Sequence, residues 1–215
     1  MASKAEATRT TVGPSPTEPT DPTAELDRQV PVLLEKGYAG LAGLSDQGLR
    51  DLVAPLADNL PGEAFVLVVA TSLVPPERMV ERTELRGRRG FTTMAGDELA
   101  RFRPTADLDV PESPVHLLVG PDTGADTLDV RPEDALPGIH ASGRTPLTLE
   151  EGLAVVTQHP EWLAERNCFE MLGSRAGDRR VTGLWLSKGA PRLGWCWVGN
   201  PHTWLGMATA ATRLG

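Results

Sequence analysis

The run Phe65-Val66-Leu67-Val68-Val69 predicts a β-strand that is covered on both faces, because five consecutive apolar residues leave no polar face for solvent. Val115 to Val119 is a similar run and predicts a further strand. Such strands need helices or a second layer to cover them. We therefore expect an α/β fold tending to α+β, with a small mixed sheet built around Phe65 to Val69.

The segments around this first strand predict helices. Thr23 to Lys36 has helical apolar spacing, and Ser45 is the expected N-cap of a second helix. After the strand, Pro75-Pro76-Glu77 opens a short helix that extends to Leu85. Gly90 to Met94 predicts the next strand, so this part of the chain is expected to form a β-α-β unit with parallel strands.

Two further helices precede the C-terminal quarter. Pro132-Glu133-Asp134 opens one, and Thr148 to Glu151 has the sequence of a capping box at the start of the other. The pattern then changes to short runs that predict antiparallel strands. These runs are Cys168 to Leu172, Val181 to Ser187, Leu193 to Val198, and Thr203 to Ala208.

All five tryptophans lie between Trp162 and Trp204, in a chain with one tyrosine and four phenylalanines. Gly199 to His202 is short enough for a hairpin loop in which Trp197 faces Trp204. Because side chains alternate along a strand, this register predicts two faces. Trp195, Trp197, Trp204 and Gly206 share one face, and Cys196, Val198, Thr203 and Leu205 share the other.

Composition sets further limits. Residues 1–22 are rich in Thr, Pro, Ser, Ala and Glu and predict a disordered tail, which leaves residues 23–215 as one compact domain. No run resembles a signal peptide or a membrane span, so we expect a cytoplasmic protein with no membrane partner. Its formal net charge of −8 argues against nucleic acid as a partner.

One basic segment departs from this acidic balance. Arg82, Arg86, Arg88 and Arg89 lie close together and are interrupted by glycine. The segment either binds a phosphate or another anion, or is a solvated loop before a strand, and the second alternative is favoured.

The cysteines offer two chemical hypotheses, both disfavoured. A thiolate at Cys196 activated by His202 is a competent nucleophile, but the hairpin register separates the two residues. A metal site built from Cys168, Cys196 and His202 has only three candidate ligands and lacks the usual short spacing. Buried, reduced thiols are the simpler interpretation, and we expect no metal and no cofactor.

Candidate binding residues gather at the predicted hairpin. Asn200, His202 and Thr203 lie at the loop edge, where they either converge on a ligand or satisfy the loop itself. The tryptophans beside them either line a pocket or pack in the core, and core packing is favoured. Arg175 and Arg144 each follow a glycine turn. Each either clamps an anion or forms a structural contact, and for Arg175 the structural contact would be a salt bridge with Asp178.

The sequence lacks a dinucleotide-binding glycine motif, a P-loop and a nucleophile elbow. The leading hypothesis is a non-catalytic protein that binds a small molecule or a protein partner. Its expected binding residues are Arg175, Trp195, Trp197, Asn200, His202, Thr203 and Trp204. The alternatives are an enzyme with His202 as general acid or base and Arg175 or Arg144 as anion clamp, and a protein-interaction module.

Several motifs resemble an actinobacterial family known only as a domain of unknown function. They are Gly143 to Thr148 with Glu151-Gly152, Gly173-Ser174-Arg175, Ala190-Pro191, Gly194 to Trp197, Gly199 to Gly206, Leu41 to Ser45, and Ser72 to Pro75. The resemblance covers nearly the whole chain after the tail, although the stretch between Gly173 and Ala190 is shorter than in the family pattern. It implies lineage and a cytoplasmic setting, and it supplies no chemistry.

Overall fold

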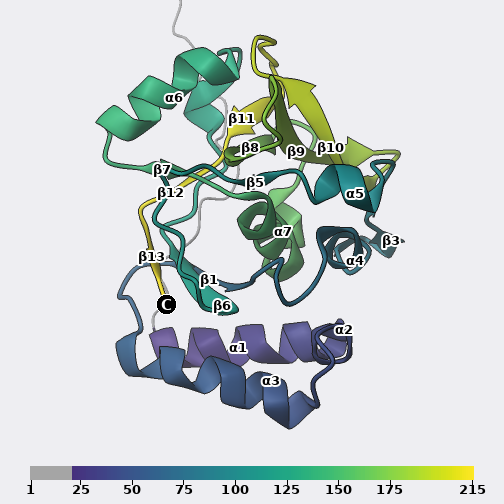
Figure 1. The fold of residues 1–215 in the computed structure, drawn as a ribbon, viewed down its shortest axis with the longest axis vertical. Coiled ribbons are helices and arrows are strands. Elements are labelled where there is room, and N and C mark those ends of the chain that lie inside the picture. Colours follow the sequence, from purple (N-terminus) through teal and green to yellow (C-terminus); the bar gives the residue numbers. More distant parts are fainter. Residues whose placement is uncertain (1–20) are drawn as a thin grey trace, which may run out of the picture.

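Two β-sheets enclose a buried helix, α7 (Leu149–Gln158), and further helices cover the outer sides of the sheets (Figure 1). The computed structural model describes residues 21–215. Residues 1–20 of the predicted disordered tail lie outside the described residues. Within the described part, no helix combines the length and apolar character needed to cross a membrane. The fold is mixed α and β, as the sequence predicts.

The smaller sheet has the strand order β1 (Phe65–Val69), β6 (Val115–Val119), β13 (Thr212–Leu214), and neighbouring strands are antiparallel. The first two strands have the predicted bounds, and all ten of their residues are buried. Helices α1 (Pro22–Glu35) and α3 (Asp46–Val53) form a layer below this sheet (Figure 1). The apolar runs therefore form a fully covered layer.

The predicted β-α-β unit is wrong. The outer edge of β1 is satisfied by the Gln29 side chain of α1, which donates to the Phe65 carbonyl oxygen at 2.9 Å and accepts from the Leu67 amide at 2.6 Å. Strand β4 (Phe91–Thr92) instead pairs with β10 (Ala190–Trp197) in the larger sheet. Because a buried amide side chain already occupies this edge of β1, no second strand adds there.

The N-terminal helices follow the predicted caps. Ser45 accepts a hydrogen bond from the Gly48 amide at 3.0 Å and begins α3, as predicted. Pro22, assigned to the tail, is the first residue of α1, because the Asp21 side chain caps that helix. The remaining helical elements are α2 (Tyr38–Leu41), η1 (Ala54–Asn59), α4 (Pro76–Val80), α5 (Gly96–Leu99), η2 (Ala125–Thr127), α6 (Pro132–Ala141) and η3 (Pro160–Trp162).

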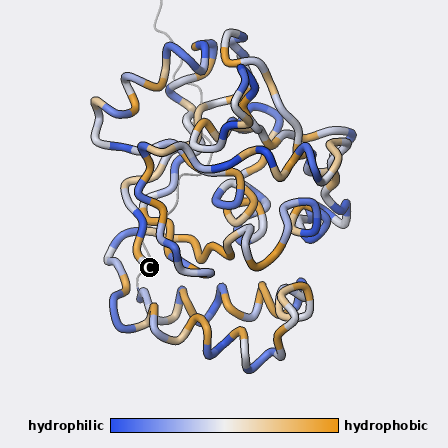
Figure 2. Tube along the Cα trace, in the orientation of Figure 1, coloured by the Kyte–Doolittle hydropathy of each residue, from blue (hydrophilic) through white to orange (hydrophobic). Residues whose placement is uncertain are grey.

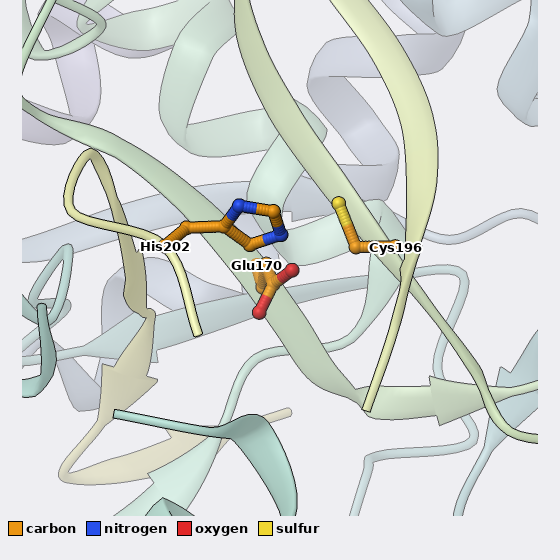
Figure 3. A group of neighbouring side chains, drawn as sticks. All are labelled: Glu170, Cys196 and His202. Atoms are coloured by element: carbon orange, nitrogen blue, oxygen red, sulfur yellow. The ribbon is translucent and has the colours of Figure 1, made fainter. Parts of the chain in front are cut away.

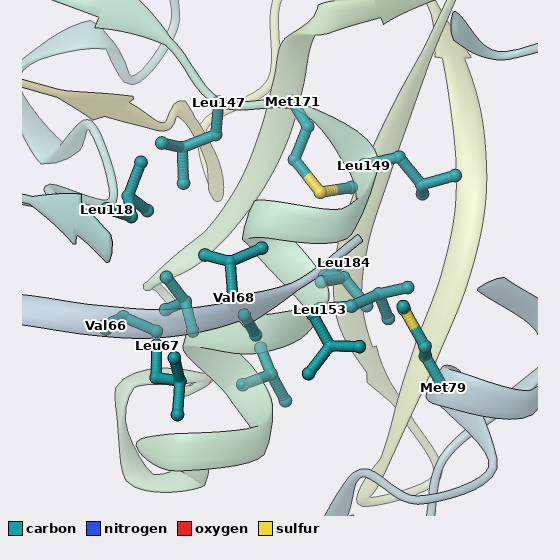
Figure 4. Packing of buried hydrophobic residues seen from close by; sticks show 14 of the residues in the cluster. Val66, Leu67, Val68, Met79, Leu118, Leu147, Leu149, Leu153, Met171 and Leu184 are labelled. Atoms are coloured by element: carbon teal, nitrogen blue, oxygen red, sulfur yellow. The ribbon is translucent and has the colours of Figure 1, made fainter. Parts of the chain in front are cut away.

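Helix α7 begins with the predicted capping box between Thr148 and Glu151 and is buried along its whole length. Its apolar residues, including Leu153, contact strands of both sheets (Figure 4). The hydropathy-coloured trace shows apolar segments concentrated between the layers (Figure 2). Gly152 allows this close packing, since a Cβ there would lie 2.0 Å from the Met171 sulfur.

Glu151 also belongs to a buried ionic network. Arg213 of β13 donates to its Oε2 at 2.8 Å, and His116 Nε2 lies 3.3 Å from its Oε1. Burial alone raises the pKa of the Glu151 carboxyl, but the contacts with His116 and Arg213 outweigh it and lower the pKa to about 2. The network joins the C-terminal strand to the central helix.

The larger sheet has six strands in the order β11-β8-β9-β10-β4, with β5 (Arg103–Pro104) paired to β8. Strands β8 (Cys168–Arg175), β9 (Arg180–Ser187) and β10 are antiparallel neighbours, as predicted. Strand β11 (Leu205–Met207) is parallel to β8. The short strands β2 (Glu84–Leu85) with β3 (Arg88–Arg89), and β7 (Thr145–Pro146) with β12 (Thr209–Ala210), form separate pairs.

The predicted hairpin between Trp197 and Trp204 is wrong. Strands β10 and β11 are both parallel to β8 and lie on opposite sides of it, so the chain between them crosses the sheet. Parallel strands require such a crossover. Backbone hydrogen bonds hold it in place. The Asp129 amide donates to the His202 carbonyl oxygen at 2.8 Å, and the Glu133 amide donates to the Val198 carbonyl oxygen at 3.1 Å.

The crossover also divides the tryptophans, so the predicted common face of Trp195, Trp197 and Trp204 is wrong. Trp195 and Trp197 pack edge to face, with ring centroids 5.0 Å apart. Trp204 instead packs against Trp185, whose position on β9 points to the opposite face of the sheet from Trp195.

A glycine fixes the end of this crossover, and we expect Gly206→Ala to destabilise the fold by about 1–3 kcal/mol. A Cβ at Gly206 would lie 2.3 Å from the Gly124 carbonyl oxygen, and backbone atoms have little room to move. Gly138→Ala is the control, because that site in α6 is open and alanine favours a helix by about 0.5–1 kcal/mol. Urea unfolding measures both, and equal effects would contradict the prediction.

Candidate functional site

The crossover lies over one face of the larger sheet, where a row across the central strands contains two glycines. Glu170 of β8 is opposite Gly183 of β9, which is opposite Gly194 of β10. The Trp185 ring occupies part of this space, since a Cβ at Gly194 would lie 2.2 Å from it. The two glycines thus let the indole ring lie close to the sheet beside Glu170.

Glu170, Cys196 and His202 meet on this face (Figure 3). One ligand atom from each lies within 4.8 Å of those of the other two. Glu170 comes from β8, Cys196 from β10 and His202 from the crossover, so three separate segments build the cluster. The predicted separation of Cys196 from His202 was wrong, because it depended on the hairpin register.

The cluster combines one buried carboxylate with two partly buried side chains, Cys196 and His202. Glu170 is fully buried, and neither of its carboxylate oxygens has a hydrogen-bond partner among the described residues. Burial raises its pKa to about 7, and the neighbouring Cys196 thiol offsets this only in part. Burial and the Glu170 charge raise the pKa of Cys196, and burial lowers the pKa of His202. Such a set suits proton transfer or cation binding.

A surface cleft of about 460 Å³ has no cluster residue in its lining, and the contact between Trp204 and His202 links it to the cluster. Its walls include the indole rings of Trp185 and Trp204, which meet edge to face with centroids 6.2 Å apart. The His202 ring lies 5.4 Å from the Trp204 ring and so connects cleft and cluster. The other lining residues are Glu165, Cys168, Leu186, Lys188 and Gly189.

Cationic side chains gather at the cleft. Lys188 lines it, and the Arg192 guanidinium lies over the Trp185 ring at 5.5 Å. Arg88 reaches its edge, because a Cβ at Gly189 would lie 3.3 Å from the Arg88 side chain. One member of the basic segment noted in the sequence therefore lies at the cleft.

The predicted site residues are only partly brought together. His202 and Trp204 lie at the cluster and cleft, whereas Asn200 and Thr203 are exposed on the crossover. Trp195 faces the other side of the sheet, where the Arg180 guanidinium lies over its ring at 5.2 Å. Trp197 is 48% exposed. The tryptophans thus belong to two different surroundings.

The two predicted anion clamps lie elsewhere. Arg175 ends β8 and donates to the backbone oxygen of Asp178 at 3.2 Å. This contact involves the residue predicted for the structural alternative, but it is a hydrogen bond to the backbone and not a salt bridge. Arg144 donates to the Gly120 carbonyl oxygen at 2.6 Å and to the Thr209 hydroxyl at 2.8 Å. It also lines a second cleft of about 470 Å³ beside α6. Most of its donors are engaged by the fold itself.

Sequence reasoning missed Glu170, Trp185 and Lys188. A detectable signal for Glu170 was its acidic side chain inside the otherwise apolar run Cys168 to Leu172. Cys168, considered as a metal ligand, instead donates to the Ala164 carbonyl oxygen at 3.2 Å, and burial raises its pKa to about 11.

Comparisons with known proteins identify the family. Residues 32–215 match the family described as "Family of unknown function (DUF5701)". No curated protein and no solved structure matches the chain. The match covers most of the chain, so the protein belongs to this family.

Proposed function

We propose that this member of a family of unknown function is a binding protein for a small, planar, anionic molecule. The observation that carries the proposal is the cleft of about 460 Å³ with Trp185 and Trp204 in its walls. Small-molecule pockets commonly have volumes of about 300–1,000 Å³ and aromatic linings with few polar groups. Two indole rings offer a planar ligand a large apolar contact area.

The charge around the cleft supports an anion. Lys188 and Arg88 bring positive charge to its surface, and the Arg192 guanidinium lies over the Trp185 ring. The lining contains one carboxylate, that of Glu165. The chain as a whole has a net charge of −8, so this cationic surrounding is a local departure. A cationic rim next to an aromatic wall favours an aromatic carboxylate or sulfonate over a neutral or cationic ring.

The probe for this proposal is 8-anilinonaphthalene-1-sulfonate, a fluorescent aromatic anion. We expect Trp204→Leu to weaken its binding at least about tenfold, because the variant removes one aromatic wall. Trp197→Leu is the matched control and should leave the affinity unchanged, since Trp197 lies apart from the cleft. Fluorescence titration of folded proteins measures both affinities. Equal affinities in the two variants would exclude the cleft as the binding site.

An acid-base enzyme is the second candidate, and one observation favours it. The Glu170 carboxyl, with its pKa raised to about 7, lies beside the His202 imidazole, which suits a general acid and base near neutral pH. A panel of p-nitrophenyl esters and phosphates tests this candidate. Turnover that survives in His202→Ala would remove His202 from the mechanism.

A protein-interaction role rests on Trp197. Among the described residues, it is the large hydrophobic side chain that is exposed, at 48%. Tryptophan is enriched at protein interfaces relative to the rest of the surface. This alternative predicts self-association that rises with concentration and is reduced in Trp197→Ser, which sedimentation velocity measures.

A further inference from the structure

We infer that Glu170, Cys196 and His202 form a binding site for a transition-metal ion, with Zn²⁺ as the preferred metal. The three side chains supply one carboxylate oxygen, one thiolate sulfur and one imidazole nitrogen, which are the donors that Zn²⁺ takes in proteins. This inference depends only on the cluster and not on the ligand proposed for the neighbouring cleft.

The geometry needs only small adjustments. Around a tetrahedral zinc ion, ligand atoms lie about 3.4–3.6 Å from one another, whereas the three atoms here lie within 4.8 Å. Side-chain rotations that move the ligand atoms by roughly 1 Å close this difference. The backbone is already fixed, since the strands of Glu170 and Cys196 both pair with β9 and the His202 carbonyl oxygen is held by the Asp129 amide.

Burial supplies an independent reason. A carboxylate that is fully buried needs a compensating partner, yet both Glu170 oxygens lack a hydrogen bond among the described residues. The His202 Nε2 atom is likewise buried and unpartnered. A divalent cation would satisfy all three groups at once.

The donor set also selects the metal. Sulfur and nitrogen donors favour Zn²⁺, or Co²⁺ as its spectroscopic substitute, over Mg²⁺ and Ca²⁺, which prefer oxygen. Three protein ligands leave one position for water or an added ligand, as in catalytic zinc sites.

Cobalt titration of the metal-free full chain, kept reduced, tests the cysteine ligand. The wild type should bind one equivalent of Co²⁺ and develop a thiolate-to-cobalt charge-transfer band. Cys196→Ser should lose the band. Cys168→Ser is the matched control and should keep it, because the chain has two cysteines and Cys168 lies outside the cluster. A band that persists in Cys196→Ser, or no binding by the wild type, would overturn the inference.

Zinc competition against a chromophoric chelator tests the other two ligands. Glu170→Gln and His202→Ala should each weaken Zn²⁺ binding by at least about tenfold, whereas His140→Ala should bind as the wild type does. His202 lies on the crossover outside the strands, so its variant keeps the test valid if a core variant unfolds. Wild-type affinity in both Glu170→Gln and His202→Ala would overturn the site, and near-ultraviolet circular dichroism confirms folding of each variant.

Discussion

Arg213→Met is expected to lower the free energy of unfolding by about 3–5 kcal/mol at pH 7, because it leaves the buried Glu151 carboxylate without its main counter-charge. Arg213 is nearly inaccessible to solvent, and Glu151 is fully buried. The arginine also donates to the Thr145 hydroxyl at 2.8 Å and the Pro146 carbonyl oxygen at 3.0 Å. Its loss therefore leaves several buried acceptors unsatisfied.

The matched control breaks an ion pair at the surface. Arg179 contacts Glu133 at 2.9 Å, and both side chains are exposed. Arg179→Met should cost less than about 1 kcal/mol, since solvent screens exposed pairs. Urea unfolding monitored by tryptophan fluorescence measures both variants. A loss at Arg213 no larger than that at Arg179 would show that the buried network does not stabilise the fold.

Acid is expected to remove about 3 kcal/mol of stability through Glu151 alone as the pH falls from about 4.5 to about 2. The carboxyl has its ordinary pKa of 4.5 in the unfolded chain and a lowered pKa of about 2 in the folded protein. The unfolded state therefore binds the proton first. The stabilisation is fully present above pH 4.5 and is lost as the pH falls through the folded pKa.

Unfolding free energies measured at several pH values test this dependence. Glu151→Gln removes the titrating group, so its stability should change less over this range than that of the wild type. Glu81→Gln is the control, since Glu81 forms an exposed pair with Arg78 at 3.5 Å, and it should follow the wild-type curve closely. A Glu151→Gln curve as steep as the wild type would contradict the assignment.

The same crossover that disproves the hairpin explains the candidate site. A hairpin would keep His202 at the edge of the sheet, beyond the end of β10. The crossover instead carries it back across β9 and β8, so that it meets Glu170 and Cys196. The proposed zinc site and the proposed anion cleft both depend on this one connection.

Local sequence predicted the elements that local forces determine. The bounds of β1 and β6 follow from unbroken apolar runs, and the start of α7 follows from the Thr148 capping box. His202 and Trp204 were identified as site candidates because polar and aromatic residues adjoin there. Glu170 was not, since a single acidic residue in a strand does not reveal which side chains will face it.

The sequence by itself determined the longer helices, the central strands of the larger sheet and the two strands that are buried on both faces, whereas short strands such as β13 were not predicted. These follow from periodicity, capping and apolar character, which act over a few residues. Only the tertiary structure decided which strands pair. The Gln29 side chain closes one edge of β1, and the β8 edge accepts β11 in parallel, which forces the crossover. Strand pairing depends on hydrogen-bonding edges supplied by distant segments, and a local sequence pattern does not specify them.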